Sequence, residues 1–240
     1  MKWLMAHITR EGPGVQKDAP PKQGFTLLID VIARNWWELI QLNLLVIAFG
    51  LPLVTLPAAL VAATRICVLM LEDRNVYLGR DFLDAFRQRF WRATALGGIA
   101  AAVLGLAGYA AFVFLQASTA NLFLALPLTV SVSTAVFALI AASYAFVLAA
   151  MSDQPLIATL RVALLGALAR PLPALAALGF VALLWLLHVL FYPVSIFMPA
   201  VINFSFGTLA VAFGVHKAAA RLLTLDQSVD PGAAYAGGSA

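Results

Sequence analysis

The side chains that could support catalysis do not form a recognised catalytic pattern in this sequence. Its three histidines, His7, His188 and His216, are far apart, and its single cysteine, Cys67, lies in an apolar stretch. No pair of carboxylates falls inside an apolar run, and no glycine-rich phosphate motif or spacing of metal ligands is present. The sequence therefore predicts a protein that is not an enzyme, with no catalytic residues, no metal site and no cofactor.

One break in the first long apolar run could instead bind a ligand. Gly50-Leu51-Pro52 and Leu56-Pro57 interrupt this run. In membrane transporters, carbonyl groups freed by unwound backbone often bind polar ligands. A plain tight turn explains the same residues. If the break binds a ligand, the expected residues are Asn43, Pro52, Thr55, Pro57 and Arg65.

Arg65 is the only charged residue well inside an apolar segment. It lies seven residues before Glu72, which corresponds to roughly 10 Å along a helix. A cation inside a membrane is unfavourable, and this makes Arg65 a candidate functional residue. The alternative is that its side chain extends to the lipid headgroups or pairs with a carbonyl at a helix end.

Residues 81–92 combine aromatic and basic side chains in a second candidate site. Phe82, Phe86 and Phe90 recur every four residues, so they share one face of a helix. This face could fill a groove in a partner protein, with arginines at its edge, or the segment could lie on anionic lipid. The expected contact residues are Asp81, Phe82, Phe86, Arg87, Arg89, Phe90 and Arg92.

The elements that hold these residues are predicted to be membrane-spanning helices. Hydrophobic residues make up 63% of the chain and charged residues 11%, whereas soluble domains average about a quarter charged. No charged residue lies between positions 93 and 152 or between 171 and 216. Lipid accepts such segments only as helices or closed barrels, and runs without alternating polarity indicate helices. The predicted fold class is all-α, a polytopic membrane bundle.

Six spans are expected. Four are clear, and the apolar run before them predicts a proline-broken hairpin; a single bent helix, giving five spans, is the alternative. Amphipathic helices are expected at residues 25–36, 81–91 and 156–169, and a small-residue stripe predicts helix packing. The predicted spans are residues 36–53, 56–72, 93–115, 128–151, 172–190 and 194–215, and the stripe is Gly97, Ala101 and Gly105.

Charge placement predicts the orientation. With six spans, the loop cations fall on one side, which the positive-inside rule assigns to the cytoplasm. Both termini are then cytoplasmic, and the chain is a multi-pass protein of the bacterial inner membrane. We expect a flexible leader over residues 1–24, one membrane domain over residues 25–222 and a disordered tail over residues 223–240.

Two stretches carry a resemblance. Residues 43–60, NLLVIAFGLPLVTLPAAL, and residues 80–94, RDFLDAFRQRFWRAT, resemble the YesL-like family of small bacterial membrane proteins. The resemblance implies a protein of unassigned biochemical function that is commonly encoded beside carbohydrate ABC-transporter components.

These observations favour a non-enzymatic accessory protein of the inner membrane, associated with ABC-type carbohydrate uptake. Its expected partners are the lipid bilayer and ABC permease subunits, and no nucleic acid is expected. The sequence is also compatible with a homo-oligomer. The alternative is a small transporter or channel in its own right. The shortage of polar residues inside the apolar runs weighs against that alternative.

Overall fold

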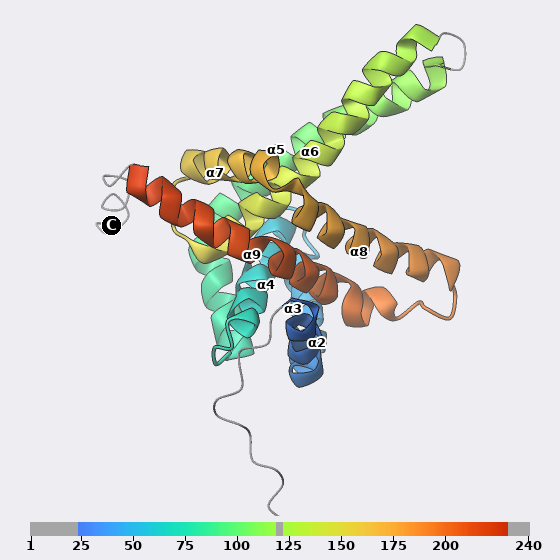
Figure 1. The fold of residues 1–240 in the computed structure, drawn as a ribbon. Coiled ribbons are helices and arrows are strands. Elements are labelled where there is room, and N and C mark those ends of the chain that lie inside the picture. Colours follow the sequence, from blue (N-terminus) through green and yellow to red (C-terminus); the bar gives the residue numbers. More distant parts are fainter. Residues whose placement is uncertain (1–23, 119–121, 230–240) are drawn as a thin grey trace, which may run out of the picture.

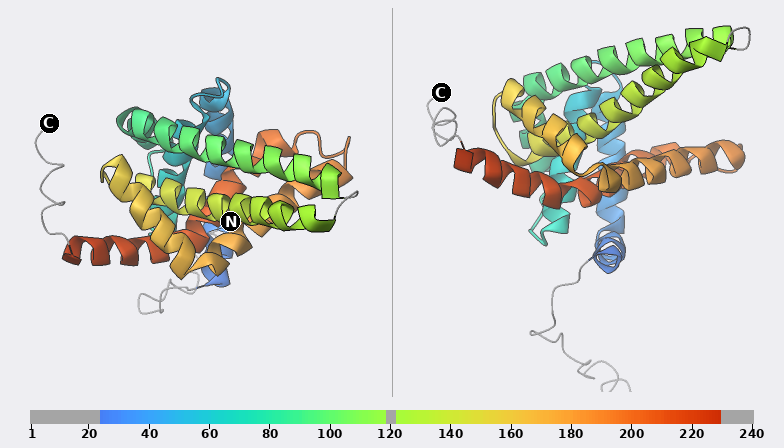
Figure 2. Two further views of the ribbon diagram at one scale, coloured as in Figure 1. Left: turned by 90° about the horizontal axis from the view of Figure 1, so that it is seen from above. Right: turned by 45° about the horizontal axis from the view of Figure 1, so that its top comes forward.

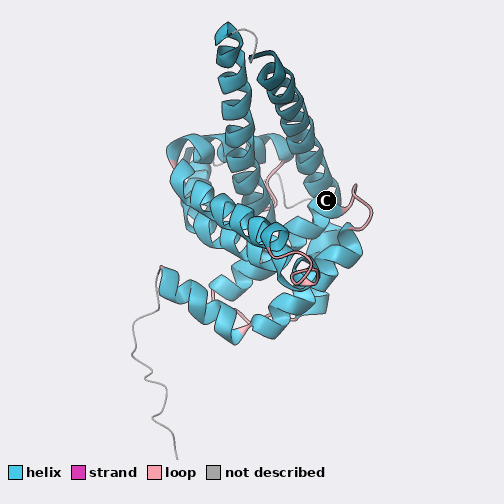
Figure 3. Ribbon diagram, turned by 90° about the vertical axis from the view of Figure 1, so that its right-hand side faces the viewer, coloured by secondary structure: helices cyan, strands magenta, loops and turns pink. Residues whose placement is uncertain are grey.

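The computed structural model describes residues 24–118 and 122–229, and all regular structure within them is helical (Figure 3). This confirms the all-α fold class. Figure 1 shows the elements, and in chain order they are α2 (Phe25–Arg34), α3 (Trp36–Gly50), α4 (Leu56–Leu71), α5 (Leu78–Ser118), the short 3-10 helix η1 (Leu122–Leu124), α6 (Ala125–Met151), α7 (Leu156–Ala169), α8 (Pro171–Leu190), the π-helix η2 (Pro199–Asn203) and α9 (Phe204–Val229).

Four of the described helices are long and apolar enough to cross a membrane. They are α5, α6, α8 and the continuous helix formed by η2 and α9. Helices α3, α4 and α7 are apolar but shorter. This set of helices is that of a multi-pass membrane protein, as the sequence predicts.

The first apolar run forms the predicted hairpin. Helices α3 and α4 pack antiparallel on either side of residues 51–55, and Leu42 and Val46 of α3 share a buried cluster with Ala59 and Ile66 of α4. The single bent helix is therefore wrong. Pro57 is tolerated because it lies in the first turn of α4, where no amide donor is needed.

Helix α4 ends in a motif that positions the next helix. Asp73 adopts a left-handed conformation with φ of 54°. The Arg74 and Asp73 amides donate to the carbonyl oxygens of Leu69 and Met70 at 3.0 and 3.2 Å, which is the Schellman pattern. The short turn that follows brings α5 back along α4.

Two predicted boundaries inside the chain are wrong. Residues 81–91 do not form a separate interfacial helix, because α5 runs unbroken for 41 residues and nothing near Ala93 interrupts it. The last helix begins with η2 at Pro199 and not at residue 194, because Pro193 and Pro199 lack the amide donors that a helix interior needs.

The predicted ends of the membrane domain can be compared only in part. Helix α9 continues to Val229, so the first part of the expected tail is helical. No strong helix breaker occurs before Pro231. The expected leader lies outside the described residues, apart from Gly24.

Helix α4 lies at the centre of the molecule, and two hairpins diverge from it. Twelve of its sixteen residues are buried, and many are alanines that let α3, α5, α6 and α9 approach closely. The α5–α6 hairpin and the α8–α9 hairpin leave this core in different directions (Figures 1 and 2).

Polar contacts gather five parts of the chain at one end of the bundle. Arg34 of α2 binds Asp73 at 2.7 Å, Arg89 of α5 binds Asp153 at 3.0 Å, and Gln154 donates to Asp226 of α9 at 3.3 Å. We call this the polar end. It joins α2, the α4–α5 turn, α5, the α6–α7 turn and the last part of α9.

Candidate functional site

The break at residues 51–55 is a turn that satisfies its own polar groups. The Thr55 hydroxyl lies 2.5 and 2.7 Å from the carbonyl oxygens of Phe49 and Pro52, and the Thr55 amide donates to Pro52 at 2.8 Å. Leu51 and Leu53 point outward and are largely exposed. The carbonyls of Phe49, Pro52 and Leu53 thus accept hydrogen bonds from within the turn, as in a plain turn.

Asn43 does not contribute to that break. It is fully buried, and its amide nitrogen donates to the carbonyl oxygens of Pro199 and Ala200 at 2.9 and 2.6 Å. Its amide oxygen accepts from the backbone of Phe204 and Ser205 at 2.9 and 3.0 Å. Asn43 therefore fastens α3 to η2 and to the first turn of α9.

The phenylalanine stripe of α5 packs inside the chain. Phe82 is fully buried, and the rings of Phe82 and Phe86 lie 5.5 and 5.1 Å from that of Phe49 in α3. Phe90 continues the cluster, 5.5 Å from Phe86. Phe82 is therefore not available to a partner or to lipid, whereas Phe86 and Phe90 are only half-buried. Arg87 and Trp91 stay exposed.

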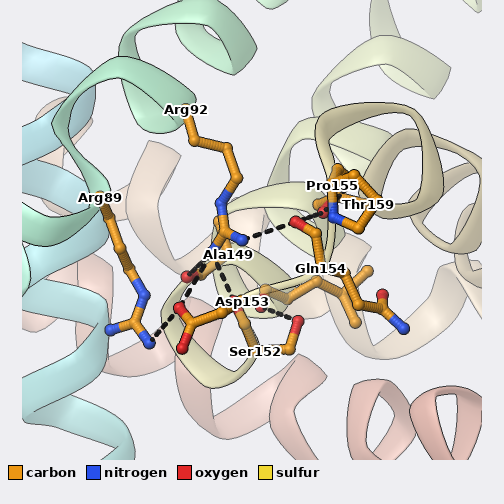
Figure 4. A network of polar contacts seen from close by, with 9 residues as sticks. Arg89, Arg92, Ala149, Ser152, Asp153, Gln154, Pro155 and Thr159 are labelled. Carbon is orange, nitrogen blue, oxygen red and sulfur yellow. Dashed lines mark hydrogen bonds and ion pairs between the residues drawn. The ribbon is translucent and has the colours of Figure 1, made fainter. Parts of the chain in front are cut away.

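Arg92 joins α5 to the end of α6 (Figure 4). Its guanidinium donates to the carbonyl oxygens of Ala149 and Gln154 at 2.8 and 2.6 Å, and also to that of Ser152. A cation at these carbonyls stabilises the C-terminal end of α6. Arg89 lies beside it and pairs with Asp153 (Figure 4). Both arginines thus hold the α6–α7 turn against α5.

Arg65 is one of the residues that line a pocket at the polar end. The pocket has a volume of about 310 Å³ and lies between α4, the α4–α5 turn and the start of α5. We call it the arginine pocket. Its polar lining residues are Arg65, Arg74, Asn75, Tyr77, Asp81, Asp84, Gln88 and Arg89.

Charges in the arginine pocket are only partly balanced. Arg65 forms no hydrogen bond or ion pair with any described residue, and Arg74 is 3.7 Å from Glu72 in an exposed pair. The Nε atom of Arg89 is buried without a partner in the described chain. Of the two aspartates, Asp81 accepts the Tyr77 amide at 2.9 Å.

This geometry suits an anion. Guanidinium groups bind carboxylates and phosphates through several parallel hydrogen bonds. Arg65 lines the pocket together with other polar residues. It does not bind carbonyls at a helix end, as Arg92 does at the end of α6. For a metal, by contrast, no group of three His, Cys, Asp or Glu ligands occurs among the residues described.

The small-residue stripe is a packing seam at one position. A Cβ on Gly97 would lie 2.2 Å from Cγ of Pro57, so α5 and α4 touch there. Gly105 has open space beyond it, and Ala101 is exposed. The stripe does not continue as a seam within the described chain, because the α5–α6 hairpin extends beyond the turn of the α3–α4 hairpin.

Several pocket residues escaped the sequence prediction. Arg74 and Asn75 lie in the turn, and Asp84 and Gln88 share the α5 face of Asp81 at intervals of three and four residues. That spacing is a usable signal, because it places polar residues together on one side of a helix. These polar residues lie on the face of α5 next to the phenylalanine stripe.

Comparisons with known proteins bear on the same part of the chain. A search of curated proteins and a search of solved structures returned no match. A scan against family models, however, matched one segment of the chain. This segment includes most of α3 and α5 and all of α4, and it contains Asn43, the α3–α4 turn and all residues of the arginine pocket. Residues 39–111 match the model of a family described as a protein of unknown function, DUF624.

Proposed function

We propose that this chain is a YesL-like, non-enzymatic accessory protein of the bacterial inner membrane that binds another membrane protein through its polar end. The observation that carries this proposal is the arginine pocket. Arg65 is without a bonding partner in the described chain, whereas the other two arginines of the pocket pair with acids beside it, Arg74 with Glu72 and Arg89 with Asp153. An acidic side chain or a chain terminus of a partner would complete the pocket.

The proposed partner is the permease subunit of an ABC-type carbohydrate uptake system. This choice rests on the resemblance of residues 43–60 and 80–94 to the YesL-like family. Cytoplasmic location of both termini belongs to the same proposal, because it places the pocket where the cytoplasmic loops of a permease lie. Exposed Trp91 and Arg87 next to the pocket suit lipid headgroups.

The contacts inside the apolar helices support an accessory role over transport. The hydroxyl groups of Thr64, Ser131 and Ser143 each donate to the carbonyl four residues earlier, at 2.8 to 2.9 Å. Asn43 is fully engaged with η2 and α9. Polar groups satisfied in this way do not form a path for a solute.

Purification in mild detergent tests the proposal. We expect an ABC permease subunit, identified by mass spectrometry, to co-purify with the unmodified chain. The double variant Arg65→Gln/Arg74→Gln should lower its recovery by about tenfold or more, because hydrogen bonds to charged groups are among the stronger ones.

A second double variant separates the pocket from general positive charge. Arg87→Gln/Arg221→Gln removes two exposed arginines outside the pocket, and permease recovery should stay unchanged. Equal loss with both double variants would show that total charge alone matters. An eluate without a permease would refute the proposed partner.

A further inference from the structure

A second cavity lies inside the apolar part of the molecule. It has a volume of about 310 Å³ and lies between α4, α6, α8 and the η2–α9 helix. This volume is at the lower end of the range for small-molecule sites, roughly 300–1,000 Å³. It is separate from the arginine pocket, because the two share no lining residue.

Asn203, the last residue of the π-helix, is one of the residues that line this cavity, and its amide is unsatisfied. Its side chain is almost completely buried, with 1% of the residue exposed. Neither Nδ2 nor Oδ1 has a hydrogen-bond partner in the part of the chain that the structure describes. Buried amides without partners are rare because they are unfavourable, so each one calls for a missing partner.

The backbone around Asn203 is held in place by other contacts. Asn43 binds the Pro199 and Ala200 carbonyls at the start of η2 and the Phe204 amide just after it. Single π-turns of this kind occur often at functional sites. The amide of Asn203 therefore lies on a fixed support.

Three hydroxyl groups complete the polar part of the lining. Thr64, Ser143 and Thr208 donate their protons to carbonyl oxygens of their own helices at 2.8, 2.9 and 2.7 Å. Toward the cavity they can therefore only accept hydrogen bonds. Together with the amide of Asn203, the walls offer two donor hydrogens and several acceptors.

These donors and acceptors define the chemistry of the ligand. None of the described residues that line the cavity is charged, so an ionised head group would be left without a counter-charge. Hydroxyl groups both donate and accept, and they match the amide of Asn203 and the three hydroxyl oxygens. The ligand is therefore neutral and carries at least one hydroxyl group.

The rest of the lining indicates where the ligand comes from. Most of it is apolar, and Leu139 and Trp185 at the cavity are 41% and 39% exposed on helices that are apolar enough to lie in a membrane. Helices α6 and α8, which line the cavity, belong to hairpins that diverge (Figure 1). Lipid in the bilayer therefore has direct access.

We infer that this cavity binds the head of a neutral, hydroxyl-bearing lipid of the diacylglycerol type, with the amide of Asn203 as its main polar contact. The acyl chains pass between α6 and α8 into the bilayer. The inference does not depend on the proposed partner at the polar end.

Binding of radiolabelled dioleoylglycerol to the protein in phosphatidylcholine nanodiscs tests this inference. The unmodified chain should retain more of the lipid than empty nanodiscs do. Asn203→Leu should weaken retention by about tenfold, because it removes both polar atoms. It should keep its thermal midpoint, since the replaced atoms have no partner in the chain.

A matched pair of threonine variants serves as a control. Thr208→Val removes a hydroxyl of the cavity, whereas Thr134→Val removes one with the same helical hydrogen bond on the exposed surface of α6. Only Thr208→Val should weaken binding.

Competition with the unmodified chain does not depend on the folding of any variant. Dioleoylglycerol whose free hydroxyl is methylated should compete poorly, and phosphatidic acid with the same chains should not compete. The inference is overturned if the methylated lipid competes equally well. It is also overturned if the protein takes up no more dioleoylglycerol than empty nanodiscs, which would mean that water alone satisfies Asn203.

Discussion

Asn43 uses both ends of its amide to join segments that are far apart in the sequence. Its four contacts reach residues between 156 and 162 positions later. The first turn of a helix leaves amide groups without partners, and a π-turn disturbs the usual carbonyl pairing. A buried asparagine from a neighbouring helix satisfies both kinds of group here.

Replacing Asn43 by alanine should therefore destabilise the protein. Asn43→Ala removes the side-chain hydrogen bonds to two carbonyls of η2 and to two amides of α9, all at a buried position. We expect a loss of about 2 kcal/mol in the free energy of unfolding. Denaturation in detergent, followed by circular dichroism, measures it.

Asn35→Ala is the control for this substitution. Asn35 makes one side-chain hydrogen bond, to the Val31 carbonyl of its own helix, and it is only partly buried. Its loss should change stability by less than half as much. Equal effects of the two variants would contradict the role given to Asn43.

The sequence marks Asn43 and Arg65 as unusual but cannot identify what they contact. An asparagine or arginine in an apolar run indicates a polar partner. The partners of Asn43 lie in another helix, and Arg65 reaches the α4–α5 turn and the start of α5. Asn203 likewise lies in an apolar run, between positions 171 and 216, and this placement is the signal that could have drawn attention to it.

At the scale of elements, α5 combines a phenylalanine stripe, which the sequence suggests for contact with a partner or lipid, and a small-residue stripe, which it suggests for helix packing. Its phenylalanines pack on Phe49, and Gly97 packs on Pro57. Periodicity reveals which residues share a face of a helix, but it does not reveal what covers that face. The α3–α4 hairpin covers this one, and only tertiary structure shows it.

The contact between Gly97 and Pro57 leads to a second prediction. Gly97→Ala places a methyl group 2.2 Å from Cγ of Pro57, so α4 and α5 must separate. We expect a loss of about 1–3 kcal/mol in unfolding free energy, as in other overpacked cores. Thermal unfolding of the purified variant in detergent measures the effect.

Gly98 provides a neighbouring control on the same helix. A Cβ on Gly98 meets no atom within 4 Å. Gly98→Ala should leave stability unchanged or raise it by up to about 1 kcal/mol, because alanine favours the helix. If Gly97→Ala behaves like Gly98→Ala, the two helices are not in close contact.

Helix types follow from the sequence more reliably than helix ends. Long apolar runs predict the long apolar helices, and the segment expected to be amphipathic at residues 156–169 has the bounds of α7. The errors near residues 93 and 194 have one cause. A change from polar to apolar residues marks where lipid begins, whereas a helix ends only where backbone hydrogen bonding fails.

At the scale of the whole molecule, the contacts of the polar end constrain the path of the chain. Ion pairs and hydrogen bonds join α2 to the α4–α5 turn, α5 to the α6–α7 turn, and that turn to α9. The chain therefore leaves this end and returns to it three times, once in each hairpin. The C-terminal ends of α3, α5 and α8 lie away from it (Figures 1 and 2).

This path predicts that the C-terminal ends of α3, α5 and α8 lie across the membrane from the polar end. Helices α3 and α4 have 15 and 16 residues, which gives each a length of roughly 22–24 Å against a hydrocarbon core of about 30 Å. Local thinning of the bilayer can accommodate such a difference at a modest energetic cost. We therefore expect the α3–α4 hairpin to cross as well.

Cysteine labelling decides this topology. Cys67 is fully buried and can be replaced by alanine to give a silent background. Single substitutions Leu53→Cys, Val194→Cys and Asn75→Cys then place thiols at exposed positions in the α3–α4 link, the α8–α9 link and the polar end. In intact spheroplasts, a membrane-impermeant maleimide should label the first two and reach the third only after permeabilisation. Labelling of Val194→Cys without Leu53→Cys would mean that the short hairpin stays on the side of the polar end, because 15 residues do not suffice to cross.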